Sequence, residues 1–92
     1  MGATTARVLQ IVNEKGLHAR ASARFVETVE RYDASAIVRR DDLEASGDSI
    51  MGLLMLAASK GTTIEVETSG PEADALAQAL ADLVADRFGE ET

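Results

Sequence analysis

The sequence has 92 residues, enough for one domain with a modest core, and 46% of them are hydrophobic. A formal net charge of −7 argues against general nucleic-acid binding, and the lack of cysteine with a single histidine excludes disulfides, thiol nucleophiles and a His/Cys metal centre. No apolar run could span a membrane and no signal-like segment begins the chain. We therefore expect one soluble, cytoplasmic domain over residues 1–92, without metal or cofactor.

The first half of the chain contains a strand, a helix and a hairpin. Residues 6–12 (ARVLQIV) are apolar and rich in β-branched side chains, which predicts a strand. From residue 19 the apolar positions take helical spacing, and we expect this helix to end near residue 31. Its apolar face comprises Ser22, Phe25, Val26 and Val29. Strands at 34–40 and 43–46 then flank a turn at Asp41-Asp42.

Residues 47–56 (GDSIMGLLML) predict a short helix that is apolar almost all round. Asp48 and Ser49 are both suitable N-cap residues, and SKG at 59–61 is expected to end the helix. A short helix cannot bury every face against one sheet, so we expect part of it to form an exposed, partner-binding patch. The alternative is a short helix that is buried on all sides.

The last third of the chain predicts a strand and a helix. Residues 62–68 (TTIEVET) alternate between apolar and acidic side chains, which is typical of a strand with one wet face. SGPE at 69–72 predicts a helix start with a Ser69–Glu72 capping box and Pro71 in the first turn, and GEET at 89–92 is expected to be frayed. The order β-α-β-β-α-β-α predicts an α+β, two-layer sandwich.

His18, the single histidine, stands at or next to the N-cap of the first predicted helix. The unpartnered N–H groups of a helix start, its positive partial charge and the guanidinium of Arg20 together suit a phosphate. From Lys15 to Arg24 there are three cations and no anion, which predicts a small basic surface. With no nucleotide-binding loop and no second histidine, His18 could not easily obtain a phosphoryl group from ATP without help, which points to a carrier fed by another protein. The alternative is a surface histidine that merely caps a helix.

Two stretches resemble the signatures of the HPr family, the histidine-containing phosphocarrier proteins of the phosphotransferase system. GLHARASARFV (16–26) resembles the active-site signature and SIMGLLML (49–56) resembles the second signature. The resemblance covers essentially the whole chain and implies an open-faced sandwich, with a four-stranded antiparallel sheet of order 1-4-2-3 beneath three helices. It also implies that His18 carries the phosphoryl group on Nδ1, supported by Arg20 and by backbone N–H groups such as that of Ala19.

The same resemblance implies partners. Enzyme I, charged by phosphoenolpyruvate, would donate the phosphoryl group and an enzyme IIA-type protein would accept it, with neither membrane nor nucleic acid involved and with a monomeric chain. Recognition would use the first and second helices. The residues implied are Ala23, Arg24, Glu27, Ile50, Met51 and Leu54.

Ser49 matches the position that a dedicated serine kinase phosphorylates in many family members. A phosphate there would lie at a helix start and place negative charge on the partner-binding face without disrupting the fold. A plain N-cap serine is the alternative. A regulatory binding module controlled by Ser49 phosphorylation is the competing function.

The sequence departs from the family pattern at two places. Ala21 stands where proline is usual and adds an N–H donor, and Asp41-Asp42 stands where an Asn-Gly type turn is common. Residues 53–77 resemble the nitrogen-related branch of the family, whereas SIMG at 49–52 is common in the sugar-uptake branch. The resemblance therefore leaves both branches open.

Overall fold

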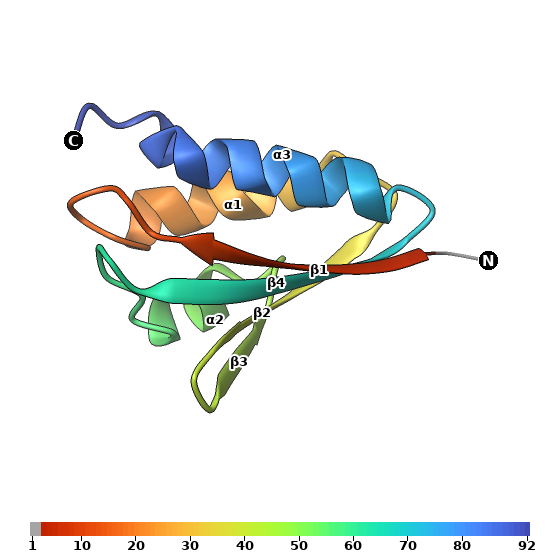
Figure 1. The fold of residues 1–92 in the computed structure, drawn as a ribbon, viewed down its shortest axis with the longest axis horizontal. Helices are drawn as coiled ribbons and strands as arrows, with labels where there is room; N and C mark the ends of the chain where they lie inside the picture. The colour runs from red at the N-terminus through yellow and green to blue at the C-terminus, as the bar shows by residue number, and fades with distance from the viewer. Residues whose placement is uncertain (1–2) are drawn as a thin grey trace.

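The computed structural model describes residues 3–92 (Figure 1). Its elements are β1 (Ala3–Gln10), α1 (Ala19–Glu30), β2 (Ser35–Arg40), β3 (Leu43–Ser46), α2 (Ile50–Met55), β4 (Thr63–Gly70), α3 (Ala73–Ala85) and a final 3-10 turn, η1 (Arg87–Gly89). The predicted order β-α-β-β-α-β-α is confirmed. No helix within the described residues is both long and apolar enough to cross a lipid bilayer.

The four strands form one antiparallel sheet of order β1-β4-β2-β3, as the resemblance implied. β4 pairs with β1 from Thr63 to Gly70 and with β2 on its other side, and β2 pairs with β3 across the hairpin. Helices α1 and α3 lie across one face of the sheet, and α2 packs between α1 and β3 (Figure 1). The fold is therefore an open-faced α+β sandwich.

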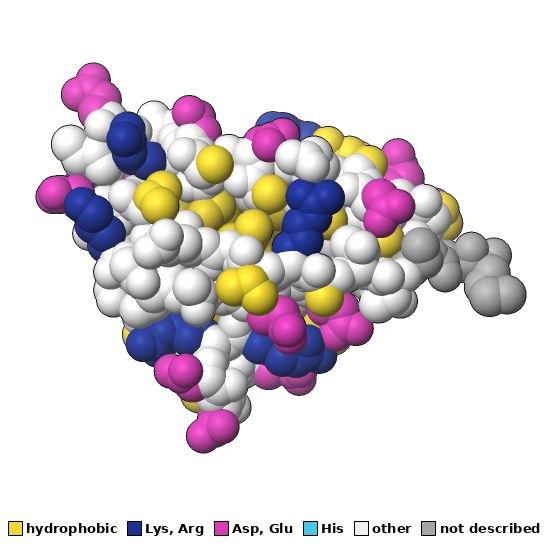
Figure 2. All heavy atoms as spheres, in the orientation of Figure 1, with side chains coloured by type: hydrophobic (Ala, Val, Ile, Leu, Met, Phe, Trp, Pro, Cys, Tyr) yellow, Lys and Arg dark blue, Asp and Glu magenta, His cyan; other side chains and the backbone are white. Residues whose placement is uncertain are grey.

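Charged side chains of both signs are interspersed on the face over α3, β1 and β4 (Figure 2). On the open side of the sheet, Arg39 bonds Glu44 at 3.1 Å, Glu65 at 3.1 Å and Glu67 at 2.8 Å. Exposed ion pairs of this kind contribute little stability. They do neutralise part of the acidic excess locally, so the net charge of −7 does not produce a uniformly acidic surface.

The first strand differs from its prediction at both ends, since β1 begins at Ala3 and stops at Gln10. Ile11 leaves the strand although its side chain is fully buried, and its N–H donates to the carbonyl of Thr62 at 2.9 Å. Ile11 is apolar because it lies in the core, and not because it extends the ladder.

Helix α2 starts where the sequence predicted but ends early. Ser49 is its N-cap and accepts a hydrogen bond from the Gly52 N–H at 3.0 Å. The helix stops at Met55, because Ala57 takes a left-handed conformation with φ of 51°. The expected end at residues 59–61 was wrong, since the apolar run continues beyond the helix as a buried connection that includes Leu56 and Ala58.

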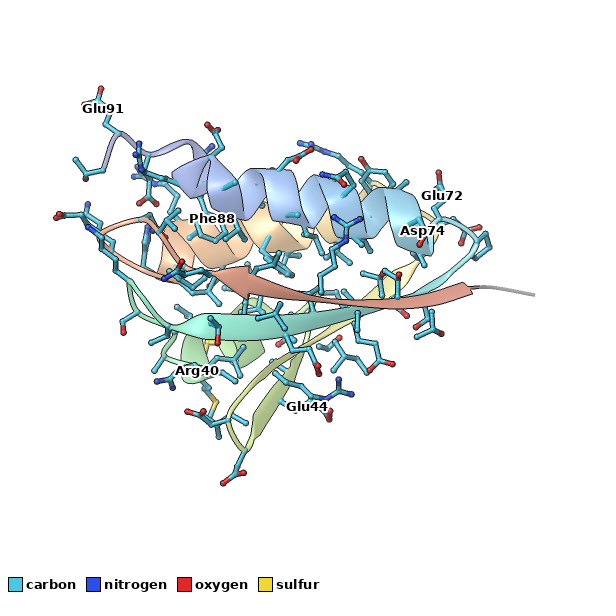
Figure 3. The ribbon with its side chains drawn as sticks, in the orientation of Figure 1. Arg40, Glu44, Glu72, Asp74, Phe88 and Glu91 are labelled. Carbon is cyan, nitrogen blue, oxygen red and sulfur yellow. The ribbon has the colours of Figure 1, made fainter. Side chains whose placement is uncertain are left out.

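Helix α3 begins at Ala73 without the predicted capping box. Ser69 and Gly70 instead pair with β1 as the last residues of β4, so Pro71 lies in the connecting turn. Glu72 is the N-cap, with no capping hydrogen bond from its side chain, and it lies at the turn before α3 (Figure 3). Its carboxylate accepts the Asp33 N–H at 2.7 Å, which ties the helix start to the connection between α1 and β2.

The expectation that residues 89–92 are frayed was wrong. Phe88 is fully buried, and the Glu14 N–H donates to the carbonyl of Thr92 at 3.1 Å. The side chain of Glu90 is also engaged, with His18 and Asn13. The chain after α3 is thus part of the packed domain and reaches the predicted site.

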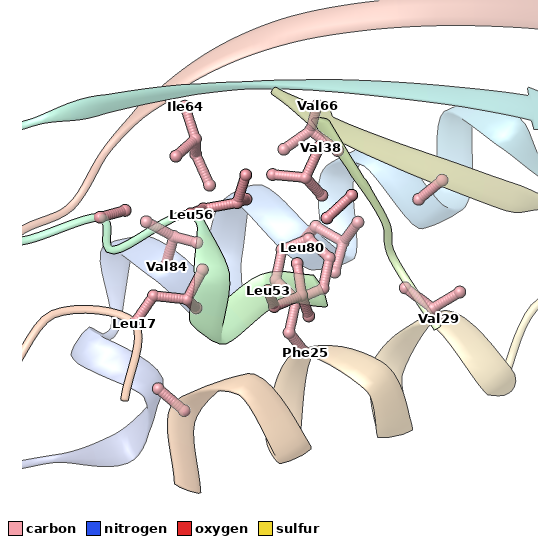
Figure 4. Packing of buried hydrophobic residues seen from close by; sticks show 14 of the residues in the cluster. Leu17, Phe25, Val29, Val38, Leu53, Leu56, Ile64, Val66, Leu80 and Val84 are labelled. Carbon is pink, nitrogen blue, oxygen red and sulfur yellow. The ribbon is translucent and has the colours of Figure 1, made fainter. Parts of the chain in front are cut away.

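The core lies between the sheet and the helices (Figure 4). It is mainly aliphatic, and Phe25 of α1 packs near Leu53 of α2 and Leu80 of α3. Full burial of such a side chain contributes about 1.5–3 kcal/mol to folding. The sheet contributes Val38, Ile64 and Val66, which are all essentially inaccessible to solvent.

Candidate functional site

His18 is the N-cap of α1, as its position in the sequence predicted. Its backbone is extended, its carbonyl accepts the Ser22 N–H at 2.8 Å, and its Nδ1 accepts the Arg20 N–H at 3.2 Å. The imidazole is partly exposed, with 28% of its side-chain surface accessible. The histidine therefore caps the helix with a ring nitrogen while remaining reachable from outside.

The other ring nitrogen contacts a carboxylate, with Nε2 of His18 lying 2.5 Å from Oε2 of Glu90. A neutral imidazole has one N–H and one lone pair, and a proton on Nδ1 would point at the Arg20 N–H, another donor. The two contacts therefore assign the proton to Nε2, which donates to Glu90. Nδ1 keeps the lone pair.

A hollow of about 300 Å³ opens beside the ring and is lined by Lys15, His18, Ala19, Arg20 and Glu90. Ala19 and Arg20 are the first residues of α1 and are exposed. Their backbone N–H groups belong to the first turn, where no intrahelical partner exists, and that of Arg20 donates to Nδ1 of His18. The Arg20 guanidinium makes no hydrogen bond or ion pair within residues 3–92. The hollow thus combines cationic side chains with a helix start, an arrangement suited to a phosphoryl group.

Ala21, the residue that replaces the usual proline, has no exposed surface at all. Its N–H group is consequently not available in the hollow. The additional donor expected from this replacement does not reach the site, and the accessible N–H groups are those of the two preceding residues.

The loop before His18 is fixed against the segment that follows α2. The Leu17 N–H donates to the carbonyl of Ala58 at 2.9 Å. Gly16 has φ of 65°, and a Cβ atom there would lie 2.5 Å from the same carbonyl oxygen. Glycine is required at this position because the backbone of the protein itself, rather than a ligand, comes so close.

The apolar patch predicted on α2 is present. Ile50, Met51 and Met55 are 41%, 69% and 74% exposed, and Leu54 is half-buried. Of the residues in α2, Leu53 alone is buried, so the alternative of a wholly buried helix is wrong. Ser49 is half-buried at the start of this patch.

The predicted residues on α1 lie along a groove between α1 and α3. Arg24 and Glu27 are exposed and Ala23 is half-buried. The groove has a volume of about 600 Å³ and its lining also includes Arg20, Thr28, Arg31 and Leu83. The groove thus extends from Arg20 at the start of α1 to Arg31 at its C-cap, so arginines line it at both ends of the helix.

Asn13 and Glu90 are the site residues that sequence reasoning missed. Asn13 is fully buried, and its Nδ2 donates to the Gly16 carbonyl at 2.8 Å and to Oε1 of Glu90 at 3.0 Å. Removal from water raises the pKa of Glu90, but hydrogen bonds from Asn13 and His18 and the charge of Lys15 outweigh this effect and hold it below its ordinary value of 4.5. The expected purely basic surface thus contains an ionised carboxylate.

Comparisons with known proteins agree with this arrangement. A sequence model described as the PTS HPr component phosphorylation site matches residues 5–86. Phosphocarrier protein HPr of Neisseria meningitidis is 46% identical over 82 residues, which cover 89% of this chain and 92% of that protein. Phosphocarrier protein NPr of Escherichia coli is 40% identical over 80 residues, which cover 85% of this chain and 89% of that protein.

The structural comparison reaches nearly the whole chain. The crystal structure of HPr-C-His from Thermoanaerobacter tengcongensis superposes with a TM-score of 0.90 at 33% identity, covering 96% of this chain and 99% of that one. The fold and the histidine-capped helix start define a small open-faced α+β sandwich protein with a phosphate-compatible site. The chain belongs to the HPr family, the phosphocarrier proteins of the phosphotransferase system, which interact with enzyme I and IIA-type proteins.

Proposed function

We propose that the protein accepts a phosphoryl group from phosphorylated enzyme I on Nδ1 of His18 and passes it to an enzyme IIA-type protein. The observation that carries this proposal is the lone pair of Nδ1 at the start of α1, beside a hollow lined by Lys15 and Arg20. A carrier needs a nucleophile that both accepts and releases the group, and an imidazole nitrogen does both.

The contacts around Nδ1 suggest how the acceptor step proceeds. The lone pair forms the N–P bond while the bond from phosphorus to the donor breaks and its electron pair leaves with the donor atom. The Arg20 N–H, which bonds Nδ1 at rest, is then free to donate to a phosphoryl oxygen together with the Ala19 N–H. The negative charge of the phosphoryl group faces the Arg20 guanidinium and the positive end of α1.

The exposed surfaces of α1 and α2 are the proposed partner face. It comprises Ala23, Arg24, Glu27, Ile50, Met51 and Leu54. The apolar side chains of α2 would fill a pocket on the partner, while the arginines along the α1 groove would attract an acidic rim. Charge complementarity of this kind raises association rates, which suits a carrier that must bind and leave repeatedly.

Ser49 is proposed as a regulatory phosphorylation site for a serine kinase. Its hydroxyl oxygen caps α2, so an attached phosphate would remain at a helix start while adding charge next to Ile50 and Met51. A module regulated only through Ser49 is the competing function. The arrangement of His18, with its lone pair on the nitrogen next to the hollow, favours the carrier, because such a module would have no use for it.

Incubation with phosphoenolpyruvate and the cognate enzyme I, followed by intact-mass measurement, tests the proposal. We expect one phosphoryl gain that acid removes and base preserves, that persists in Ser49→Ala and that disappears in His18→Ala. Adding IIA-type proteins of the sugar-uptake and nitrogen-related branches separately should discharge the carrier with one of them. No gain from an enzyme I that phosphorylates another HPr would overturn the carrier function.

A further inference from the structure

The segment after α3, residues 87–92, turns back toward the start of α1. Arg87, Phe88 and Gly89 have φ of 56°, 56° and 80°, so two non-glycine residues occupy the left-handed region in succession. Such conformations are unfavourable and persist only where surrounding contacts hold them. Full burial of Phe88 supplies one such contact (Figure 3). We call residues 87–92 the strap.

The far end of the strap is fixed as well. The carbonyl of Thr92 accepts the Glu14 N–H at 3.1 Å, and the Glu90 N–H donates to the Arg87 carbonyl at 2.9 Å. Glu90 therefore lies between a buried aromatic anchor and a backbone hydrogen bond to the loop that precedes His18. Its side chain is 18% exposed, and both carboxylate oxygens are engaged, Oε2 with His18 and Oε1 with Asn13.

Asn13 holds the carboxylate in this position. Its amide donates both to the Gly16 carbonyl and to Glu90, and the reversed amide would set its oxygen against two acceptors, so the orientation is unambiguous. Its Oδ1 is buried without a hydrogen-bond partner among residues 3–92. A buried amide with one unpartnered atom is unfavourable for stability, and its two donor bonds hold the loop and the carboxylate together.

We propose that Glu90, oriented by Asn13, is a positioning residue for phosphoryl transfer that acts by accepting the Nε2 proton of His18. The proposal rests on the function proposed above. In the resting protein this bond fixes the ring so that the Nδ1 lone pair faces the start of α1. Glu90 does not touch the phosphoryl group, because it is bound to the nitrogen on the other side of the ring.

The same contact has a second effect once Nδ1 is bonded to phosphorus. Both ring nitrogens are then substituted, Nε2 still carries its proton, and the ring is cationic. The carboxylate faces this positive charge through a charge-assisted hydrogen bond. When the group leaves, the N–P electrons return to Nδ1 and the ring is again neutral with its proton on Nε2. Neither direction requires a proton to enter or leave the site. The transfer therefore needs no second histidine to supply or accept a proton.

The hydrogen bond is tested on the unphosphorylated protein by nitrogen-15 NMR of the imidazole. Glu90→Ala removes the acceptor, and Glu91→Ala is the matched control, because it removes an equal charge from an exposed neighbour that points away from the domain (Figure 3). We expect a slowly exchanging Nε2–H signal in the wild type and in Glu91→Ala, and its loss to fast exchange in Glu90→Ala. An unchanged signal in Glu90→Ala would overturn the proposal.

The positioning role is tested by transfer kinetics with phosphorylated enzyme I, after thermal melts show that the variants are folded. Glu90→Ala should lower the rate at saturating enzyme I by about tenfold or more, with little change in half-saturation, whereas Glu91→Ala should match the wild type. Glu90→Gln keeps an acceptor and should restore part of the rate.

Two kinetic results would overturn the role of Glu90. One is a wild-type rate in Glu90→Ala despite loss of the Nε2–H signal, and the other is a lowered rate in Glu91→Ala that equals that of Glu90→Ala. If the wild type accepts no phosphoryl group, the proposed function fails instead, and the NMR result still decides whether Glu90 holds the ring.

Discussion

Helices α1 and α2 both begin at a residue whose side chain caps the helix and is a candidate for phosphorylation. Nδ1 of His18 accepts from the Arg20 N–H at 3.2 Å, and Oγ of Ser49 accepts from the Gly52 N–H at 3.0 Å. The supports differ, however. The cap of α1 is held from its other side by Glu90, whereas α2 is short and anchored by Leu53. Chemistry requires a fixed atom, whereas recognition requires exposed surface.

The surface of α2 also differs in kind from that of α1. Met51 and Met55 are unbranched, polarizable side chains that adapt to differently shaped contacts, and both are largely exposed. The α1 groove instead offers arginines, whose planar groups recognise carboxylates and phosphates in a defined geometry. A carrier with more than one partner benefits from both, because α2 tolerates variation in shape and α1 selects for charge.

His18→Ala should have the largest effect, a complete loss of phosphoryl acceptance. The fold should survive, because loss of a helix cap costs about 0.5–2 kcal/mol. Intact mass after incubation with phosphorylated enzyme I and a thermal melt measure the two effects. An acid-labile, base-stable phosphate on this variant would show that a residue other than His18 accepts the phosphoryl group. The start of α1 would then have no role as the acceptor.

Leu53→Ala should destabilise the protein by about 2–5 kcal/mol, because it removes the buried anchor of α2. Met51→Ala on the same helix is the matched control and should change the free energy of unfolding by no more than about 0.5 kcal/mol. Urea unfolding of both variants measures the difference. Equal losses would show that the methionine packs against the domain and does not form a free surface.

Arg20→Ala should slow phosphoryl transfer while leaving the fold intact, because the side chain is exposed. Hydrogen bonds to charged groups are worth about 1.5–3 kcal/mol, which corresponds to a decrease of roughly tenfold to a hundredfold in rate. Stopped-flow transfer from phosphorylated enzyme I measures this. Kinetics indistinguishable from wild type would indicate that the backbone N–H groups at the start of α1 suffice.

Ser49→Asp should maintain or slightly raise stability, by about 0.3–1 kcal/mol, because the carboxylate lies at a helix start. It should also weaken binding to enzyme I, since the new charge lies beside Ile50 and Met51. Calorimetric titration of enzyme I against both forms, with a thermal melt, separates the effects. Equal affinities would remove Ser49 from the partner face, and a large loss of stability would contradict its position as N-cap.

The smallest expected effect is the acid sensitivity of the strap. Because the folded-state pKa of Glu90 lies below 4.5, its ionised form stabilises the protein above this pH, and the contribution is lost as the pH falls through the lower, folded-state value. Glu90→Gln should therefore narrow the difference in melting temperature between pH 7 and acid. A pH dependence identical to that of the wild type would show that the contacts of Glu90 do not stabilise its ionised carboxylate.

Local signals in the sequence predicted much of the fold and part of the site. His18 and Ser49 are both followed by helical apolar patterns, so each helix start could be located within a few neighbouring residues. The exposed face of α2 followed from its composition, because a short helix that is apolar all round cannot be covered by one sheet. These features depend on contacts within a few residues along the chain.

Local patterns did not predict features that depend on distant contacts, and the sheet order was expected only from the family resemblance. Ser69 has the side chain of a cap, but pairing with β1 keeps it in the sheet. Glu90 bonds a histidine 72 positions away, and no local pattern encodes that contact. Phe88 was the available signal, because a phenylalanine this near the end of the sequence needs a buried site and brings its neighbours with it.

The Leu17 N–H donates to the Ala58 carbonyl, and Gly16 packs against the same carbonyl. These contacts couple the motions of the loop before His18 and the segment after α2. The loop before His18 cannot separate from the segment after α2 unless this contact opens. Local unfolding proceeds in cooperative units of neighbouring contacts, so the amide of Leu17 can exchange its hydrogen only when the two segments part. The loop before His18 and the segment that follows α2 therefore belong to one unit of local stability.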